Sequence, residues 1–543
     1  MKRAMVPSLW SLLDRAADLF PGYPAVVEPG RRETYAEVHR AALALARHLY
    51  KDGPGRGERV AYLGVNSGAF LASYFAAAGA GLALVPLNLR LAPKELSAIL
   101  NDSEARFIIA DVGQAASLRD TAKAGARMDH LIWTGMDVPE ADLPRPGGAS
   151  TTSLREVLDG SMAALEGEDE RLEPLVPGAG DEVAQLYYTS GTTGAPKGVI
   201  LTHRNVWSHS LGAIAELGLG PEDRWGHMAP MFHLADAWAT FAVTWVGGCH
   251  VMVPRFSPES AFEAIASEGI TVTNLVPTML NLMARHPQAR SYDRSSMRLL
   301  LSGGAPIAPS LVGELAELFG CEYVQTYGMT ETSPYLTLSI PKPHLRAGQP
   351  DRELRVRAKT GRAFATVELR LVDDAGHLVP RDERSVGEIQ VRGESVTPGY
   401  WRRPEETASA FTEGGWLRTG DLAVWDSEGY VDIVDRKKDM IISGGENIYS
   451  TEVEHALYEH DAVLEAAVVG VPDERWGEVV LAAVVLRPGR EASSEELRAF
   501  CRQRLAGYKT PKYIEFLPEL PRTGTGKILK AGIRERFGHP RSG

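Results

Sequence analysis

The stretch YYTSGTTGAPKGV, residues 187–199, gives the first indication of the kind of site that this sequence forms. It begins as an apolar strand and then supplies hydroxyls, glycines and one lysine. Glycines let a backbone turn tightly and approach a ligand, and successive amides in such a turn bind anions. The stretch therefore predicts a loop that holds phosphates, although its composition also fits a Gly-rich turn between two strands.

This loop is not of the Walker A type. The pattern G-x-x-x-x-G-K-[ST] requires a second glycine five residues after Gly191, where Pro196 stands. It also requires Ser or Thr after Lys197, where Gly198 stands. If the loop binds phosphates, it belongs to another kind of nucleotide-binding protein.

Composition limits the possible partners of the chain. Its 543 residues carry a formal net charge of −12, which argues against general nucleic-acid binding. The three cysteines, Cys249, Cys321 and Cys501, form no C-x-x-C pair, so neither a zinc motif nor a disulfide framework is expected. This usage fits a reducing cytoplasm.

Acidic residues interrupt the N-terminal segment after Pro7, which predicts an amphipathic helix and not a signal peptide.

An uncharged run over residues 60–89 is long enough to span a membrane. It includes Asn66, four glycines and Pro86, and its main parts are VAYLGV, FLASYFAAAGAG and LALVPLN. The order strand, buried helix, strand explains this run better than a membrane span does.

The first four hundred residues alternate short apolar strands with helical stretches, which is typical of parallel α/β folds. Continuous apolar strands suit a sheet buried on both faces; the candidates are residues 107–111, 250–254, 270–277 and 299–304. Residues 135–181, rich in Pro, Gly and acidic residues, predict a surface excursion or linker. From Thr366 on, alternating polarity predicts a small antiparallel barrel or sheet, and the last hundred residues or so predict a small α+β unit.

Several further motifs follow the first in a fixed order. They are MAPMFHLADAW (228–238), SGGAP (302–306), QTYGMTET (325–332), TGDL (419–422), DRKKD (435–439), SGGENIY (443–449) and PRTGTGK (521–527). Each is weak alone, but together they resemble the adenylate-forming superfamily of acyl-CoA synthetases, adenylation domains and luciferases. The resemblance extends from about Tyr35 to Arg534 and is greatest to bacterial synthetases of the fatty-acid and 4-coumarate type.

The resemblance implies the nucleotide site. Loop residues would bind the β- and γ-phosphates of ATP and stabilise the charge that develops on pyrophosphate; they are Thr189, Ser190, Gly191, Thr192, Thr193, Gly194 and Lys197. Glu331 would bind Mg²⁺, with Thr189 beside it. Other residues would contact the adenine or the ribose, namely Gly303, Gly304, Ala305, Tyr327, Gly328, Thr330, Asp421 and Arg436.

Purely structural interpretations of some of these residues stay open. Tyr327 also fits a core aromatic, and Lys197 also fits a solvated loop lysine. Arg436 also fits a surface ion pair with Asp435 or Asp439, a contact worth little.

The resemblance gives the C-terminal part a role in both half-reactions, adenylation and transfer to CoA. Lys527 would bridge the substrate carboxylate and the α-phosphate, because a cation between two anions lowers the barrier to their approach; it also fits a basic C-terminal face. Lys438 would be the hinge about which the small domain turns. Gly444 and Gly445 would leave room for the pantetheine arm of CoA.

The segment around His233 would form the wall of the acyl pocket. His233 stands where amino-acid-activating domains carry an aspartate, so an α-amino acid substrate is disfavoured, because a buried amine would lack a counter-charge. Ala235 and Ala239 are small and would admit a chain or ring. Asp236 would face the pocket or satisfy a backbone group. Trp238 lies one residue beyond the tryptophan gate of some long-chain synthetases, which leaves the chain length open.

The sequence thus predicts an α/β enzyme with two domains. Residues 1–437 would form a large AMP-binding domain of parallel α/β subdomains plus a small antiparallel barrel, and residues 438–543 a small, mobile α+β domain. The expected activity is a cytoplasmic acyl-CoA synthetase that uses ATP, Mg²⁺ and CoA on a medium- or long-chain fatty acid or an aryl acid. The alternatives are an acyl-AMP ligase that loads a carrier protein and a nucleotide-binding regulatory protein without catalysis. A homodimer and peripheral membrane contact are both compatible with the sequence.

Overall fold

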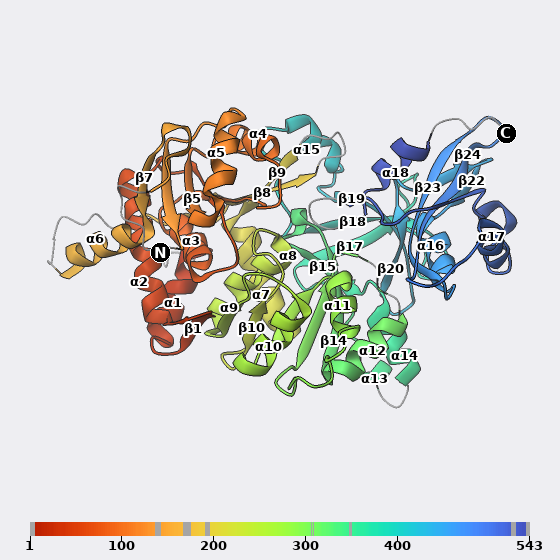
Figure 1. Cartoon of the computed structure of the whole chain (residues 1–543), viewed down its shortest axis with the longest axis horizontal. Coiled ribbons are helices and arrows are strands. Elements are labelled where there is room, and N and C mark those ends of the chain that lie inside the picture. Colours follow the sequence, from red (N-terminus) through yellow and green to blue (C-terminus); the bar gives the residue numbers. More distant parts are fainter. Residues whose placement is uncertain are drawn as a thin grey trace. The chain divides into compact units, whose positions relative to one another are not determined.

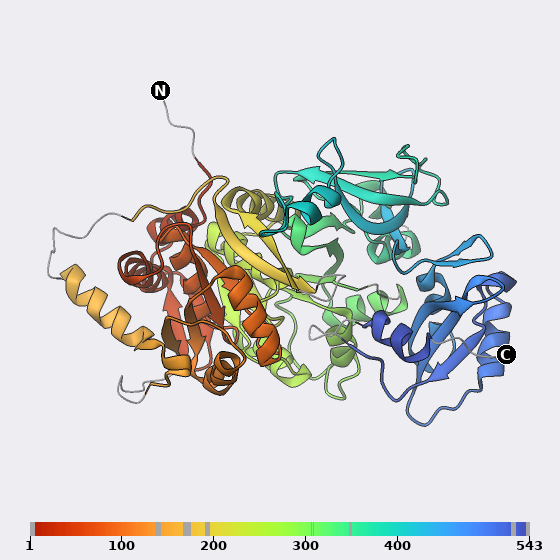
Figure 2. The same ribbon diagram turned by 90° about the horizontal axis from the view of Figure 1, so that it is seen from above.

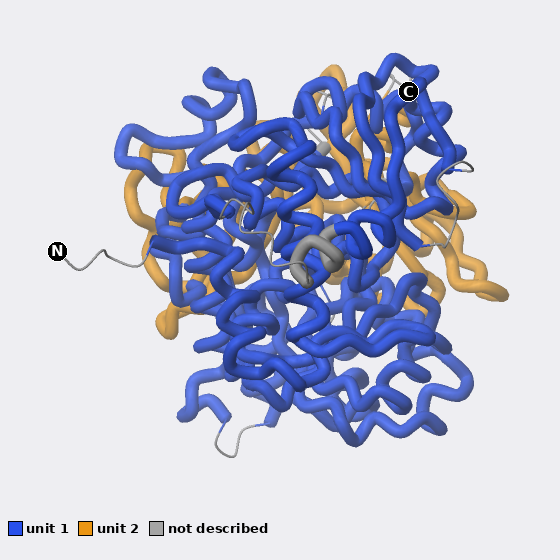
Figure 3. The backbone as a smooth tube through the Cα atoms, turned by 90° about the vertical axis from the view of Figure 1, so that its left-hand side faces the viewer, with its two compact units in different colours: residues 1–369, 391–417 blue, residues 370–390, 418–543 orange. Residues whose placement is uncertain are grey.

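In the computed structural model the chain divides into two compact units (Figure 3). One comprises residues 1–369 and 391–417, and the other comprises residues 370–390 and 418–543. The structure describes residues 6–135, 143–166, 175–190, 196–305, 307, 309–346, 350–522 and 528–538, without the side chains of 161–166 and Ser190. The domain boundary between residues 437 and 438 stays a prediction.

The first unit contains a seven-stranded sheet in the order β7-β6-β5-β3-β4-β8-β9. Neighbouring strands are parallel, except that β8 and β9 form an antiparallel pair at one edge. The strands are β3 (Arg59–Leu63), β4 (Ala83–Pro86), β5 (Phe107–Asp111), β6 (His130–Thr134), β7 (Ser150–Ser153), β8 (Val183–Ser190) and β9 (Pro196–Thr202).

The same unit contains a nine-stranded sheet in the order β16-β15-β14-β13-β12-β10-β11-β1-β2. Its six central strands are parallel and its edge strands β2, β15 and β16 are antiparallel. The strands are β1 (Pro24–Glu28), β2 (Arg31–Thr34), β10 (Arg224–His227), β11 (Cys249–Met252), β12 (Val272–Leu275), β13 (Leu299–Gly303), β14 (Glu322–Gly328), β15 (Tyr335–Leu338) and β16 (Arg362–Ala363).

Helices accompany both sheets (Figures 1 and 2). They are α1 (Trp10–Leu19), α2 (Tyr35–Asp52), α3 (Gly68–Gly79), α4 (Pro93–Ser103), α5 (Ala115–Lys123), α6 (Leu154–Glu166), α7 (His203–Leu217), α8 (Leu234–Ala237), α9 (Ala239–Val246), α10 (Pro258–Glu268), α11 (Pro277–Ala284), α12 (Pro309–Phe319), α13 (Pro343–Arg346), α14 (Pro350–Ala358) and α15 (Pro404–Ala410).

The uncharged segment folds as β3, α3 and β4, which confirms the predicted order strand, helix, strand. Helix α3 is buried almost all round because it touches strands of both sheets, β3 and β4 in one and β1 in the other. The hydroxyl of Tyr74 on α3 lies 2.8 Å from the hydroxyl of Tyr187 and donates to the carbonyl of Met231 at 2.8 Å. Helix α3 therefore joins the strand before the glycine-rich loop to the segment predicted to border the acyl pocket.

The second unit holds most of a four-stranded sheet and all of a five-stranded one. The first has the order β17-β18-β19-β20, with β19 and β20 antiparallel, and its strands are β17 (Val367–Val372), β18 (Gly387–Gly393), β19 (Leu417–Trp425) and β20 (Val431–Arg436). The second has the order β22-β21-β24-β23, with β25 beside β24, and its strands are β21 (Ile441–Ser443), β22 (Glu446–Ile448), β23 (Val463–Asp473), β24 (Gly477–Leu486) and β25 (Tyr513–Phe516). Its helices are α16 (Ser450–Tyr458), α17 (Ser494–Arg502) and α18 (Lys530–Phe537).

The predicted α/β architecture and the predicted strands are confirmed, with one exception. Residues 135–181 were expected to be a surface excursion, but they include β7, which pairs with β6 at the sheet edge, and α6. The Ser/Thr-rich sequence of β7 lacks the apolar pattern of a central strand, which is why its pairing was missed.

Within the residues that the structure describes, none of the helices combines the length and apolar character that crossing a bilayer requires.

Candidate active site

The glycine-rich stretch is a β-hairpin whose stem is described. Strands β8 and β9 pair in antiparallel register, with Thr189 opposite Lys197 and Ser190 opposite Pro196. Thr189 and Lys197 are half-buried at the end of this stem. Gly191, Thr192, Thr193 and Gly194 lie outside the described residues, so their contacts with phosphate stay predictions.

A second segment, residues 397–401, runs beside this stem. Tyr400 forms a bridge with Val199, and the backbone N–H of Trp401 donates to the carbonyl of Gly198 at 2.7 Å. The hydroxyl of Thr397 donates to the carbonyl of Ile200 at 2.5 Å. The segment thereby fixes the stem of the hairpin from one side.

The same segment also holds Glu331, the predicted magnesium ligand. The backbone N–H of Thr397 donates to the carbonyl of Glu331 at 2.7 Å, and the hydroxyl of Tyr400 donates to its Oε1 at 2.9 Å. Lys197 lies over the Tyr400 ring, with Nζ 5.5 Å from the ring centre. Tyr400 thus connects the predicted phosphate lysine with the predicted metal-binding carboxylate, and no motif in the sequence singles it out.

Electrostatics keep the hydroxyl of Tyr400 protonated beside Glu331. Burial, followed by the negative charge of Glu331, raises the pKa of Tyr400 above its usual value of 10.0, so the phenol keeps its proton and acts as a donor. Glu331 as a whole is 7% exposed. A buried carboxylate accepting a hydrogen bond from a neutral phenol is poised to accept a cation as well.

The predicted adenine residues come together at the carboxyl ends of β13 and β14. Gly303 pairs with Thr326, so the segments 303–305 and 327–330 are neighbours at this edge. A Cβ at Gly303 would lie 2.2 Å from Thr326 Oγ1, and a Cβ at Gly328 would lie 1.8 Å from the carbonyl oxygen of Pro334. Both glycines are therefore required by close strand packing, whether or not a nucleotide is bound.

Ala305 and Gly304 are exposed at this edge, and Tyr327 is half-buried rather than enclosed in the core. Ligands in open α/β sheets bind outside the carboxyl ends of the strands. Half-burial of Tyr327 leaves part of its ring accessible, as stacking on a base requires.

In the second unit, the predicted ribose residues face each other across two strands. Asp421 on β19 pairs with Arg436 on β20, and Arg436 Nε lies 3.4 Å from Asp421 Oδ1. The alternative partners of Arg436 are otherwise engaged: Asp435 accepts hydrogen bonds from Ser450, and Asp439 from Arg534 at 2.9 Å. The side chain of Arg436 therefore pairs with Asp421 and not with Asp435 or Asp439.

The predicted hinge and CoA segments also lie in the second unit. Lys438 is exposed in the turn between β20 and β21. Gly444 and Gly445 form the turn of the β21–β22 hairpin with φ of +60° and +87°, a left-handed pair that suits glycine. Lys527 lies outside the described residues.

The acyl-pocket segment is held in place by Asn66. Its Nδ2 donates to the carbonyls of His227 at 2.9 Å and Ala229 at 2.8 Å, while its Oδ1 accepts from the N–H of Met231 at 2.8 Å. His233 is half-buried at the start of α8, its ring 4.7 Å from that of Phe232, and Ala235 is exposed. Ala239 is fully buried in the core.

Asp236 has a structural role in this segment. It is fully buried and accepts hydrogen bonds from Trp225 Nε1 at 3.2 Å and from His227 Nδ1 at 2.6 Å. The hydrogen bonds continue from His227 Nε2 to His250 Nδ1 at 2.9 Å, and from His250 Nε2 to Thr244 Oγ1 at 3.0 Å. Both carboxylate oxygens thus accept hydrogen bonds within the core. Asp236 therefore belongs to this network and not to the pocket wall.

Trp238 is likewise a core residue. It is fully buried, with its ring centre 5.0 Å from that of Trp225 and 5.1 Å from that of Tyr335.

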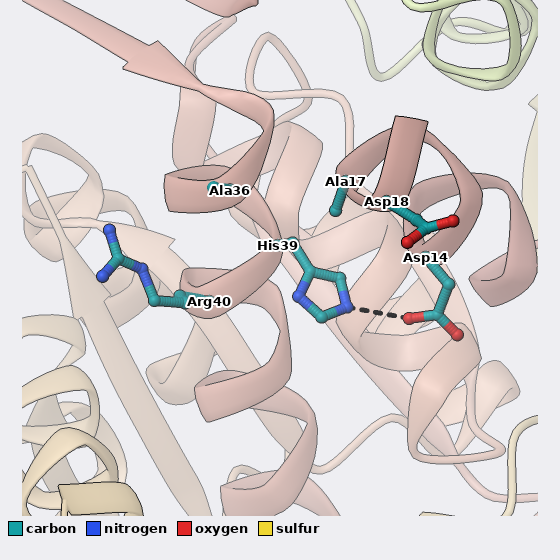
Figure 4. Close-up of a pocket in the computed structure, with 6 residues that line it drawn as sticks. All are labelled: Asp14, Ala17, Asp18, Ala36, His39 and Arg40. Carbon is teal, nitrogen blue, oxygen red and sulfur yellow. Dashed lines mark hydrogen bonds and ion pairs between the residues drawn. The ribbon is translucent and has the colours of Figure 1, made fainter. Parts of the chain in front are cut away.

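A hollow between α1 and α2, where His39 Nε2 lies 2.8 Å from Asp14 Oδ1, is lined by none of the predicted site residues (Figure 4).

Comparisons with known proteins cover nearly the whole chain. A family model described as AMP-binding enzyme matches residues 13–401, and one described as AMP-binding enzyme C-terminal domain matches residues 452–527. The feruloyl-CoA synthase of Amycolatopsis sp is 40% identical over 529 residues, 96% of this chain and 98% of that protein. The long-chain-fatty-acid–CoA ligase of Thermus thermophilus is 38% identical over 541 residues, 98% of this chain and 95% of that protein. The ATP-bound crystal structure of MatB from Rhodopseudomonas palustris is 30% identical, with a TM-score of 0.84 over 98% of this chain and 99% of that one.

Proposed function

The chain belongs to the family of AMP-binding enzymes, and from this premise we propose that it joins a medium- or long-chain fatty acid or an aryl acid to CoA. The enzyme is a ligase of the acyl-CoA synthetase class and uses ATP. The proposed reaction converts the acid, ATP and CoA to acyl-CoA, AMP and pyrophosphate through an acyl-adenylate. The match of both the large and the C-terminal family models within one chain is the observation that carries this proposal.

The site residues divide the chemistry between them. The β8–β9 hairpin and Lys197 bind the phosphates, and Tyr327 with the segment 303–305 binds the base. Asp421 accepts hydrogen bonds from the ribose hydroxyls, because an ionised carboxylate suits a diol. The thiol of CoA then attacks the mixed anhydride, so the protein needs no nucleophile of its own.

The donor set near Glu331 fits Mg²⁺. This ion binds proteins through one or two carboxylates and takes its other ligands from phosphates and water. Among the residues that the structure describes, no group of three His, Cys, Asp or Glu side chains could hold a metal. Glu331 would hold the ion, which would offset negative charge on the phosphates, while Tyr400 keeps the carboxylate oriented.

The acyl side favours an acid without a charged amine. His233 and Ala235 offer no negative charge, and the oxygens of Asp236 already accept hydrogen bonds from Trp225 and His227. An α-amino group would therefore be desolvated without a counter-charge, which is costly. We also expect a cytoplasmic location, in keeping with three free cysteines.

The test is ATP turnover with Mg²⁺ against a panel of fatty and aryl acids, with and without CoA, resolving AMP from ADP. AMP and acyl-CoA that depend on both acid and CoA are the expected result. AMP release that is indifferent to CoA but follows an added carrier protein would move the assignment to an acyl-AMP ligase. ADP as the product would contradict the proposal.

A further inference from the structure

Two buried asparagines hold two segments of the site by the same chemistry. Asn66, in the loop between β3 and α3, is 5% exposed, and Asn205, in the first turn of α7, is 6% exposed. Each side chain donates two hydrogen bonds to backbone carbonyls and accepts one from a backbone N–H. Because a carbonyl can only accept and a backbone N–H can only donate, each amide has one possible orientation.

Asn66 acts on the segment that leads to His233. The path of this segment depends on side-chain contacts, because residues 228–233 form neither a helix nor a strand. Asn66 accepts a hydrogen bond from the N–H of Met231 at 2.8 Å and donates to two carbonyls just before it. The hydroxyl of Tyr74 donates to the carbonyl of Met231 at 2.8 Å. Side chains thus bind both polar groups of Met231, two residues before His233.

Asn205 acts on the segment that holds Glu331. Its Nδ2 donates to the carbonyls of Glu394 at 2.8 Å and Val396 at 2.9 Å, and neither of these residues belongs to a helix or strand. One residue further on, the N–H of Thr397 donates to the carbonyl of Glu331 at 2.7 Å. Asn205 therefore fixes the chain immediately before the residue that holds the predicted magnesium ligand.

The hydrogen bonds of the two asparagines within the described part of the chain go to different residues, so each asparagine holds its own segment. We propose that Asn66 and Asn205 are positioning residues that set two affinities of the site separately, Asn66 the affinity for the acid and Asn205 the affinity for Mg²⁺. This inference rests on the proposed function and deepens it. A displacement of about 1 Å in a site can reduce activity by about 100-fold, so loss of either set of contacts should be measurable.

The test measures two quantities in Asn66→Ala and Asn205→Ala: KM for the acid that the native enzyme uses best, and the Mg²⁺ concentration for half-maximal activity. Asn66→Ala should raise KM for the acid by about 10-fold or more and change the Mg²⁺ requirement by less than about twofold. Asn205→Ala should raise the Mg²⁺ requirement and leave KM for the acid within the same limit. A purely structural role would reduce the amount of active enzyme, and hence the apparent kcat, without moving either quantity.

Milder variants act on the same two segments, because each alanine variant leaves three buried backbone groups without a partner and can prevent folding. Tyr74→Phe removes one hydrogen bond to the carbonyl of Met231 and should raise KM for the acid alone, by about 2- to 10-fold. Thr397→Val removes the hydroxyl that donates to the carbonyl of Ile200 and should raise the Mg²⁺ requirement alone, by a similar factor.

The inference is overturned if a folded variant shifts the other quantity as much as its own, or if neither quantity moves in the folded variants. If the alanine variants do not fold, Tyr74→Phe and Thr397→Val decide by the same criteria. Either result would leave the proposed function intact, since the native enzyme still forms acyl-CoA. If the native enzyme yields AMP and acyl-CoA with no acid of the panel, the proposed function itself fails, which is a distinct outcome.

Discussion

The hydroxyl of Tyr400 donates a hydrogen bond to Oε1 of Glu331 at 2.9 Å, although 69 residues separate the two in sequence. The same tyrosine supports Lys197 on its ring and bridges Val199 in the hairpin stem. A displacement of Tyr400 would therefore disturb the predicted metal-binding carboxylate and the predicted phosphate loop together. This relationship places Tyr400 as a positioning residue for the proposed reaction.

Tyr400→Phe tests this role, because it keeps the ring beneath Lys197 and removes only the hydroxyl. A hydrogen bond to a charged group is worth about 1.5–3 kcal/mol, so we expect kcat/KM to fall by roughly 10- to 100-fold. The Mg²⁺ concentration for half-maximal activity should rise, since the carboxylate loses its orientation. Activity measured over a Mg²⁺ titration gives both quantities.

Tyr188→Phe is the matched control for that variant. Tyr188 also donates its hydroxyl to a carboxylate, Asp102 Oδ2 at 2.7 Å, but that carboxylate is not a predicted metal ligand. We expect this variant to keep the Mg²⁺ dependence of the native enzyme. An unchanged Mg²⁺ requirement in Tyr400→Phe would contradict the positioning role.

Asp236→Ala should destabilise the protein strongly. The substitution leaves the buried N–H groups of Trp225 and His227 without their acceptor, and each buried donor left unsatisfied costs about 1–3 kcal/mol. Chemical unfolding followed by tryptophan fluorescence reports the loss, since Trp225 is part of the network. Asp236→Asn, which preserves volume and one acceptor oxygen, should cost less.

Asp120→Ala serves as the control, because Asp120 pairs with Lys123 on an exposed helix surface. Such pairs add little to stability, so the unfolding midpoint should not move measurably. If Asp236→Ala unfolds at the same denaturant concentration as the native protein, the network is not the structural element described above.

Acid should weaken the attachment of the N-terminal segment through His203. This imidazole is buried and its Nδ1 accepts from the N–H of Leu9 at 3.2 Å, while burial lowers its pKa from 6.5 to about 4. The unfolded chain therefore binds a proton more readily than the folded one. The free energy of unfolding should fall as the pH drops from about 6.5 to about 4, by about 3 kcal/mol at most from this residue.

His203→Gln keeps an acceptor for Leu9 and removes the titration. Unfolding free energies at pH 7, 6, 5 and 4.5 should show a shallower decline for this variant than for the native protein. Equal pH dependence of the two proteins would show that His203 does not titrate as described.

Lys527→Ala should separate the two half-reactions, as the sequence resemblance implies. We expect it to abolish formation of acyl-AMP, because no cation would then stand between the two reacting anions. Transfer of a supplied acyl-AMP to CoA should persist. Loss of both half-reactions in a variant that folds would refute the assigned role.

Much of the fold was predictable because buried parallel strands are continuous apolar runs. The strands β5, β11, β12 and β13 and the buried helix α3 all followed from that pattern. Strand β7 did not, because the segment STTS lies at a sheet edge and carries no apolar alternation. Its position is set by pairing with β6 and not by its own composition.

The site was predictable only where a motif is local. Thr189, Lys197, Asp421 and Arg436 could be singled out because each lies within a short motif, and the structure shows Thr189 opposite Lys197 and Asp421 opposite Arg436. Tyr400 was missed because its partner, Glu331, lies far from it along the chain. Asp236 was left between two roles because only the folded chain shows that Trp225 and His227 on β10 contact it.

The central claim is that the acid is activated by attack of its carboxylate on the α-phosphate of ATP. It is tested most directly by turnover of a carboxylic acid labelled with ¹⁸O in both carboxyl oxygens, followed by mass spectrometry of the nucleotide product. We predict that AMP carries one ¹⁸O atom, because the mixed anhydride leaves one carboxylate oxygen on the phosphate when CoA attacks. Unlabelled AMP, or ADP accompanied by labelled inorganic phosphate, would contradict the account.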